Sequence, residues 1–105
     1  MKMIRVILRP ERESAVAAAL MEAGFPALTK WEVVGRGKQQ GIQLGEQLYD
    51  GLAKSLLLLV VPDDRLETAV ATIMTAGFSG NHGDGKIFVT PVEQAYTVRS
   101  GKAEL

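Results

Sequence analysis

The run from Ser55 to Val61 constrains the fold most, because it is apolar on both of its alternating faces. A strand that buries both faces belongs in the middle of a sheet. The run leads directly into Pro62-Asp63-Asp64, which opens a helix with Asp64 and Glu67 spaced as a capping pair. One apolar stripe at helical spacing follows, formed by Leu66, Ala69, Val70, Ile73 and Met74. The sequence therefore predicts a central strand followed at once by a helix.

The N-terminal third of the chain predicts the same plan. Met3 to Leu8 is a short run rich in β-branched residues and fits a strand. Pro10 suits the first position of a helix from Glu11 to Ala23, and Gly24 follows as its C-terminal stop. Between Thr29 and Val33 every second residue is charged, which is the period of a half-buried strand.

Lys86 to Thr90 predicts a further strand, and Tyr96 to Arg99 a short one. The order is then β-α-β, a long connection, and β-α-β. This order predicts an α+β fold of the ferredoxin-like βαββαβ type. A chain of 105 residues with 47% hydrophobic residues has room for one compact domain, so we expect a single domain over residues 1–105.

Composition excludes several classes of function. The chain has 12 basic and 12 acidic residues, whereas a nucleic-acid binder would carry a basic surplus. It has no cysteine, so neither a disulfide framework nor a thiolate metal site can form. The N-terminus does not have the pattern of a signal peptide, and the longest apolar run is far shorter than a membrane span. We therefore expect a cytoplasmic protein with no membrane insertion.

The connection from Gly35 to Ala53 is too long for plain packing to explain. It holds five glycines and joins two strands. Compact domains rarely keep unstructured connections beyond about 12–15 residues unless the loop is functional or disordered. A functional loop is the interpretation that this length favours, and a mobile linker without a role is the alternative.

A second glycine-rich stretch runs from Ser79 to Lys86. Its three glycines allow backbone N–H groups to converge on an anion, and Lys86 adds a charge suited to phosphate. The stretch is not a Walker P-loop, because it enters a strand and lacks the required spacing. The alternative is an ordinary Asp-Gly turn with a surface lysine.

Catalysis has little support in the sequence. His82 is the only histidine, and there is no cysteine to pair with it. No serine carries the marks of an activated nucleophile, and no pair of carboxylates suggests acid–base chemistry. We therefore expect a protein that is not an enzyme.

Taken together, these residues resemble the PII signal-transduction family over essentially the whole chain. The matching segments are Met3 to Pro10, Thr29 to Gly35, Gly37 to Gly41, Lys54, Leu56 to Asp64, Gly83 to Val89, and Arg99-Ser100-Gly101. Gly83 to Val89 is the most specific, because it matches the family's B-loop and fourth strand at the right distance from the T-loop base. The resemblance places the T-loop at residues 36–53, the B-loop at 79–86 and the C-loop at 95–105.

The resemblance implies a trimer, either a homotrimer or a heterotrimer with a paralogue, with nucleotide clefts between subunits. ATP or ADP phosphates would lie against Gly83, Asp84, Gly85 and Lys86, with Arg99 contributed by the adjoining subunit. The adenosine side would be lined by Thr29, Gly35, Gly37, Lys38 and Val60. Gln39 would ligand Mg²⁺ shared between ATP and 2-oxoglutarate, and Lys54 would pair with a 2-oxoglutarate carboxylate. Gln40 and Gly41 complete the ligand-binding set that the resemblance implies.

The short loop and the Leu-Tyr-Asp before Lys54 resemble the nif-linked branch of the family. That branch implies binding to the dinitrogenase component of nitrogenase through the T-loop, with release by 2-oxoglutarate and MgATP. Tyr49 lies near the loop's return, and the stretch that carries the family's modifiable tyrosine is missing. Thr97 replaces a second phosphate-binding arginine and Asn81 a lysine, so phosphate binding would depend on Lys86 and Arg99.

Three alternatives to this function stay open. Within the family, the same loop could instead dock on an ammonium channel or on an enzyme of nitrogen metabolism. A small hydrolase of acylphosphatase type shares the topology, but it needs a phosphate-cradling loop after the first strand, where this chain has only Leu8 to Glu11. A trimeric metal-binding or structural protein is the third, and no His/Cys/acidic cluster supports a dedicated metal site.

Overall fold

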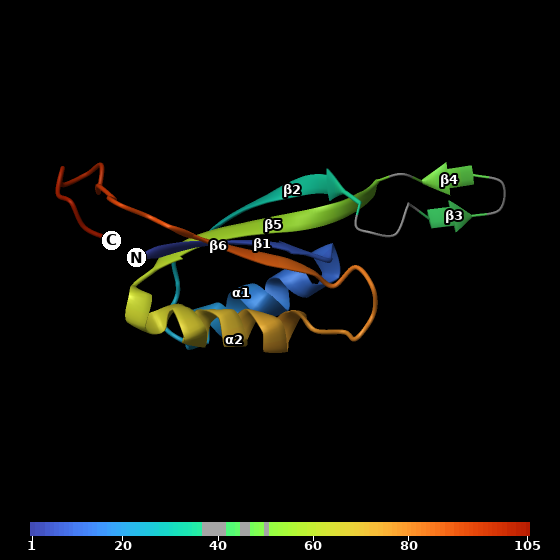
Figure 1. The fold of residues 1–105 in the computed structure, drawn as a ribbon, viewed down its shortest axis with the longest axis horizontal. Helices are drawn as coiled ribbons and strands as arrows, with labels where there is room; N and C mark the ends of the chain where they lie inside the picture. The colour runs from blue at the N-terminus through green and yellow to red at the C-terminus, as the bar shows by residue number, and fades with distance from the viewer. Residues whose placement is uncertain (37–41, 45–46, 50) are drawn as a thin grey trace.

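The computed structural model describes residues 1–36, 42–44, 47–49 and 51–105. Its main sheet has four strands in the order β2 (Thr29–Gly35), β5 (Leu52–Val61), β1 (Lys2–Leu8) and β6 (Gly85–Pro91), each antiparallel to its neighbour (Figure 1). Helices α1 (Glu13–Glu22) and α2 (Leu66–Gly77) pack side by side on one face of this sheet. The predicted α+β fold of ferredoxin-like type is confirmed.

Strand β5 is central, as its apolar run predicts. It pairs with β1 on one side and with β2 on the other. Ser55, Leu57, Leu59 and Val61 are buried toward the helices, while the residues between them point to the opposite face. The strand begins at Leu52, earlier than predicted, because Leu52 to Lys54 pair with the last residues of β2.

The core lies between the sheet and the helices. Its fully or nearly fully buried side chains are Ile4, Val6, Leu8, Val16, Leu20, Phe25, Leu57, Leu59, Val61, Ala69 and Ile73. Near the end of α2, a Cβ at Gly77 would stand 3.3 Å from Leu8 Cδ2, so only a small residue lets the helix approach β1 this closely. The end of α2, and with it the loop toward β6, is therefore fixed against the sheet.

No described helix or strand covers the opposite face of the sheet (Figure 1). Strand alternation and register place apolar residues there from all four strands, namely Met3, Ile7, Trp31, Val33, Leu56, Leu58, Val60 and Phe88. Trp31 is 46% and Phe88 49% exposed. The uncovered face of the sheet therefore carries a patch of apolar side chains from all four strands, which in proteins marks an interaction surface.

The connection between β2 and β5, residues 36–51, contains two short strands of its own. β3 (Ile42–Leu44) and β4 (Gln47–Tyr49) pair antiparallel, with Ile42 opposite Tyr49. In Figure 1 this hairpin extends beyond the end of the main sheet. These two strands were not predicted, and the functional role predicted for the segment stays a prediction.

Several predicted boundaries are wrong. The first helical segment is a 3-10 turn η1 (Pro10–Arg12) followed by α1, which begins only at Glu13. The capping pair predicted at Asp64 and Glu67 is absent, because neither η2 (Asp63–Arg65) nor α2 has a side-chain cap bond. The neighbouring Asp63 carboxylate pairs with the N-terminal ammonium at 2.9 Å. In place of the short strand predicted from Tyr96 to Arg99, the structure has an isolated antiparallel bridge between Tyr96 and Ala103. Within the described ranges, no helix has the length and apolarity needed to cross a membrane.

Candidate anion-binding site

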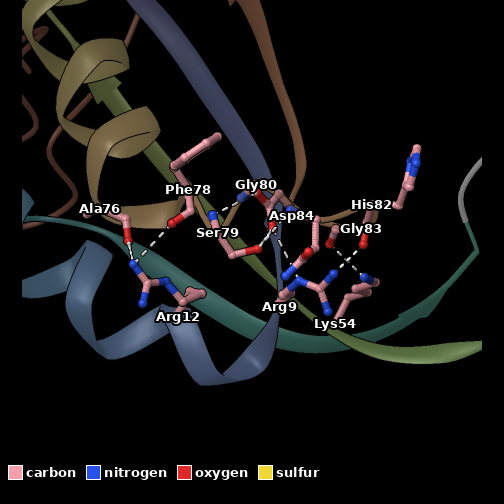
Figure 2. A network of polar contacts seen from close by, with 11 residues as sticks. Arg9, Arg12, Lys54, Ala76, Phe78, Ser79, Gly80, His82, Gly83 and Asp84 are labelled. Atoms are coloured by element: carbon pink, nitrogen blue, oxygen red, sulfur yellow. Dashed lines mark hydrogen bonds and ion pairs between the residues drawn. The ribbon is translucent and has the colours of Figure 1, made fainter.

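The Asp84 carboxylate organises the loop between α2 and β6. It accepts hydrogen bonds from the backbone N–H of Ser79 at 2.8 Å and of Gly80 at 3.0 Å, and from the Ser79 hydroxyl (Figure 2). These bonds, those from Ser79 first, hold the pKa of Asp84 well below its ordinary value. Asp84 is therefore ionised at neutral pH, and its charge is used to close the loop on itself.

Arg9 binds the same loop from the end of β1. Its Nε donates to Asp84 Oδ1 at 3.3 Å, and its guanidinium also donates to the backbone carbonyl of His82. The two partners of this ion pair are partly buried, with 27% and 24% of their side chains exposed. Strand alternation carries Arg9 to the uncovered face of the sheet, after Arg5 and Ile7.

Lys54 approaches the loop from β5. Leu8 and Ser55 are opposite each other in the β1–β5 ladder, so Arg9 and Lys54 are neighbours at its end. Lys54 Nζ donates to the carbonyl of Gly83 at 3.0 Å (Figure 2). In the part of the chain that the structure describes, Asp84 is the only carboxylate bonded to this pair of cations. The cluster therefore has more positive than negative charge.

Two glycines make this arrangement possible. Gly83 has φ +92°, and a Cβ there would lie 3.2 Å from Arg9 Nη2 and 3.4 Å from Lys54 Nζ. Gly85 has φ +117°, and its Cβ would lie 1.7 Å from the carbonyl oxygen of Ile7. Positive φ favours glycine at both positions, and at Gly85 the backbone of β1 also leaves no room for a side chain.

Most of the predicted phosphate residues come together at this end of the sheet. Lys86 is opposite Ile7, which places it on the same face as Lys54. Together with Arg9, these lysines put three cations around the loop of Gly83 to Gly85. Gly35 ends β2 beside Leu52, at the same end of the sheet. Such a cluster suits a phosphate or carboxylate ligand.

The other predicted residues are not brought to the loop within one chain. Thr29 begins β2 and Val60 lies near the end of β5, so both are at the far end of the sheet from Lys54. Arg99 lies in the turn after the Tyr96 bridge, and the C-terminal segment that contains it lies at the opposite end of the molecule from the loop (Figure 1). Gly37, Lys38, Gln39, Gln40 and Gly41 lie outside the described residues.

Sequence reasoning missed Arg9 and Ser79. Arg9 continues the alternation of β1 beyond its last paired residue, which was a usable signal. Ser79 is a residue type that often bonds to loop backbone and carboxylates, but nothing in the sequence indicated its partner. The predicted phosphate contact at Asp84 stays a prediction, and sequence reasoning missed that its carboxylate binds the loop and Arg9.

A hollow of about 430 Å³ lies between α2 and β6, on the helix side of the sheet. Most of its lining is apolar and includes Ile73, Met74 and Phe78, while Asp84, Gly85 and Lys86 of the loop also line it. Within the described ranges, no group of three or more His, Asp or Glu side chains is placed to hold a metal ion.

Comparison with known proteins identifies the family of the chain. The sequence model of the nitrogen regulatory protein P-II family matches residues 1–102. The chain is 56% identical over 100 residues to the nitrogen fixation nifHD region GlnB-like protein 1 of Methanothermobacter marburgensis, covering 95% of each chain. It is 54% identical to the protein of that name in Methanobacterium ivanovii, again over 95% of each chain. The nifHD1 region GlnB-like protein 1 of Methanosarcina barkeri is 51% identical over the full length of both chains.

Proposed function

The chain belongs to the P-II family of nitrogen regulatory proteins, of the type found in nif regions, and on that premise we propose that it is a non-catalytic cytoplasmic sensor of ATP or ADP and 2-oxoglutarate that controls nitrogenase. The observation that carries the proposal is the convergence of Arg9 and Lys54 on a glycine-rich loop that holds only one carboxylate. Both proposed ligands are anions, and this cluster has uncompensated positive charge for them.

The nucleotide phosphates would bind at Gly83 to Lys86, and a 2-oxoglutarate carboxylate would bind Lys54. Gln39 would supply one oxygen to Mg²⁺, with the others coming from phosphate, 2-oxo acid and water. This division fits Mg²⁺, which prefers oxygen ligands and is usually bound by few protein groups.

The site would be completed by a trimer, formed with further copies or with a paralogue. Two observations support an oligomer. The uncovered sheet face is apolar, with Trp31 and Phe88 half exposed. Thr29 and Val60 lie at the other end of the sheet from the loop, and the C-terminal segment with Arg99 lies at the other end of the molecule, so these residues would meet a nucleotide bound at the loop from a neighbouring subunit.

The connection at residues 36–51 would act as the T-loop that docks on the target. The dinitrogenase component is the proposed target, because the relatives named above are nif-region proteins. MgATP and 2-oxoglutarate would stabilise a T-loop conformer that cannot dock. Moving such an equilibrium from nearly all of one state to nearly all of the other takes about 5.5 kcal/mol of differential binding. Two or three charge-assisted contacts of about 1.5–3 kcal/mol each would supply it.

Isothermal titration of 2-oxoglutarate, with and without MgATP, tests the sensor. We expect binding only when MgATP is present, and we expect Gln39→Ala to bind ATP but to lose the 2-oxoglutarate response. A full response in that variant would contradict the Mg²⁺ role of Gln39. Absence of all binding by the wild type would refute the sensor function. Recovery of an ammonium channel instead of dinitrogenase in pull-downs would contradict the target.

A further inference from the structure

Lys54 has a weak partner for its charge. Its ammonium donates to the carbonyl oxygen of Gly83, a neutral acceptor, and none of the ion pairs in the described part of the chain includes Lys54. Hydrogen bonds between a cation and an ionised acceptor are roughly twice as strong as neutral ones. An anionic ligand that reaches Lys54 would therefore draw it away from the loop.

Arg9 differs from Lys54 in this respect. Its guanidinium is bound both to the carbonyl of His82 and to the ionised Asp84. Because Arg9 already has an ionised partner, exchanging it for an anionic ligand would gain little free energy. Arg9 would therefore keep the loop attached to β1 after Lys54 has left the Gly83 carbonyl. Of the two cations that hold the loop, only Lys54 is readily exchanged.

The bond from Lys54 fixes the orientation of one peptide unit. The carbonyl of Gly83 and the N–H of Asp84 belong to the same planar trans peptide and point in opposite directions. While the carbonyl faces Lys54 (Figure 2), the N–H on the opposite side of this peptide points away from Lys54. Turning this peptide changes ψ of Gly83 and φ of Asp84. Gly83 has no side chain to obstruct the turn, and Asp is one of the non-glycine residues that most often adopt the positive φ that the turned peptide requires.

We infer that Lys54 is a releasable latch on the loop, and that transfer of its ammonium from the Gly83 carbonyl to an anionic ligand frees the next N–H to face a bound phosphate. The identity of the two anions, a 2-oxo acid carboxylate and a nucleotide phosphate, rests on the proposed function. The latch itself is a property of the ligand-free chain. Binding of either ligand would favour the state in which the hydrogen bond from Lys54 to the Gly83 carbonyl is broken. Each ligand would therefore raise the affinity for the other by the same factor.

The latch can be tested without any ligand, by nuclear magnetic resonance. Lys54→Met should shift the carbonyl ¹³C signal of Gly83 and the amide signal of Asp84, because the carbonyl loses its donor. The matched control is Lys30→Met, which removes a lysine that bonds Glu13 at 2.7 Å instead of the loop, and should leave both signals in place. Unchanged Gly83 and Asp84 signals in Lys54→Met would overturn the latch.

The coupling is tested by the sign of a change in ATP affinity, measured without 2-oxoglutarate. At about 0.5 M salt, where long-range attraction is screened, Lys54→Met should bind ATP about 2- to 10-fold more tightly, the factor that one net hydrogen bond represents. If Lys54 only attracts phosphate, the variant binds more weakly, and that result overturns the inference. A wild type that binds no ATP refutes the proposed function, while the resonance shifts still decide the latch.

Discussion

Substitution of Gly85 by alanine should be among the most damaging single changes in this chain. The added Cβ would lie 1.7 Å from the carbonyl oxygen of Ile7 and 2.8 Å from its carbonyl carbon. Both atoms belong to the backbone of β1, which pairs with β6 at this point, so no side chain can move aside. The backbone of Gly85 also has φ +117°, a region that alanine rarely adopts.

The expected loss follows from these two effects. An unfavourable positive φ costs about 1–3 kcal/mol. Relief of the contact requires β6 to separate from β1 here, which breaks one or two ladder hydrogen bonds at about 0.5–1.5 kcal/mol each. The free energy of unfolding should therefore fall by about 2–6 kcal/mol, a large part of the 5–15 kcal/mol typical of a small domain.

Gly80→Ala is the matched control. Gly80 also has positive φ, at +85°, but the nearest atoms to its added Cβ belong to the Phe78 ring, at 3.5 Å. That ring is 69% exposed and free to move, so only the strain of about 1–3 kcal/mol remains. Urea unfolding at equal protein concentrations, followed by the fluorescence of Trp31, compares the two variants. If Gly85→Ala loses no more stability than Gly80→Ala, the backbone contact with Ile7 does not restrict this position.

Three further predictions concern the loop, the core and the uncovered face. Because hydrogen bonds from Ser79 lower the pKa of Asp84, its ionised form adds stability that is fully present above about pH 4 and is lost as the pH falls through the lowered value. Asp84→Asn should therefore be less stable than wild type in urea at pH 7, and the two curves should converge in acid; parallel curves would contradict this. Leu57→Ala should lose about 2–5 kcal/mol in the same assay, because Leu57 is fully buried, and a loss below 1 kcal/mol would contradict its place in the core. Leu58→Glu, on the uncovered face, should lower the molecular mass measured by light scattering without unfolding the chain. The control Val34→Glu, at an edge position that is 78% exposed, should leave the mass unchanged. An unchanged mass for Leu58→Glu would argue against the sheet face as the subunit interface.

The four strands and two helices of the domain were predictable because each has a local pattern. The apolar run of β5 and the alternation of β2 are visible in any short window of sequence. Helix ends were less predictable, because Pro10 and Asp63 begin 3-10 turns and Asp63 finds a partner in the distant N-terminal ammonium. The strands β3 and β4 were missed, since three-residue strands carry no periodic signal.

The candidate site was predictable in its loop and not in the side chains that hold it. Gly83 to Lys86 are contiguous, so their glycines and lysine can be recognised directly. The contacts of Arg9 join residues 73 and 75 positions apart and depend on the register of β1 against its neighbours. No local pattern contains that information. For the same reason the role of the Asp84 carboxylate in holding the loop, through Ser79 and Arg9, could not be predicted.

The position of Lys54 explains how one ligand could be sensed by two separate segments. Lys54 is the third residue of β5, so it lies directly after the point where the connection of residues 36–51 returns to the sheet. Its side chain contacts Gly83, in the loop before β6. If the proposed ligand binds Lys54, it would therefore act on the base of the connection through the β5 backbone and on the loop through the Gly83 carbonyl. No conformational signal has to cross the core, because β2, β5, β1 and β6 hold both segments at the same end of the sheet.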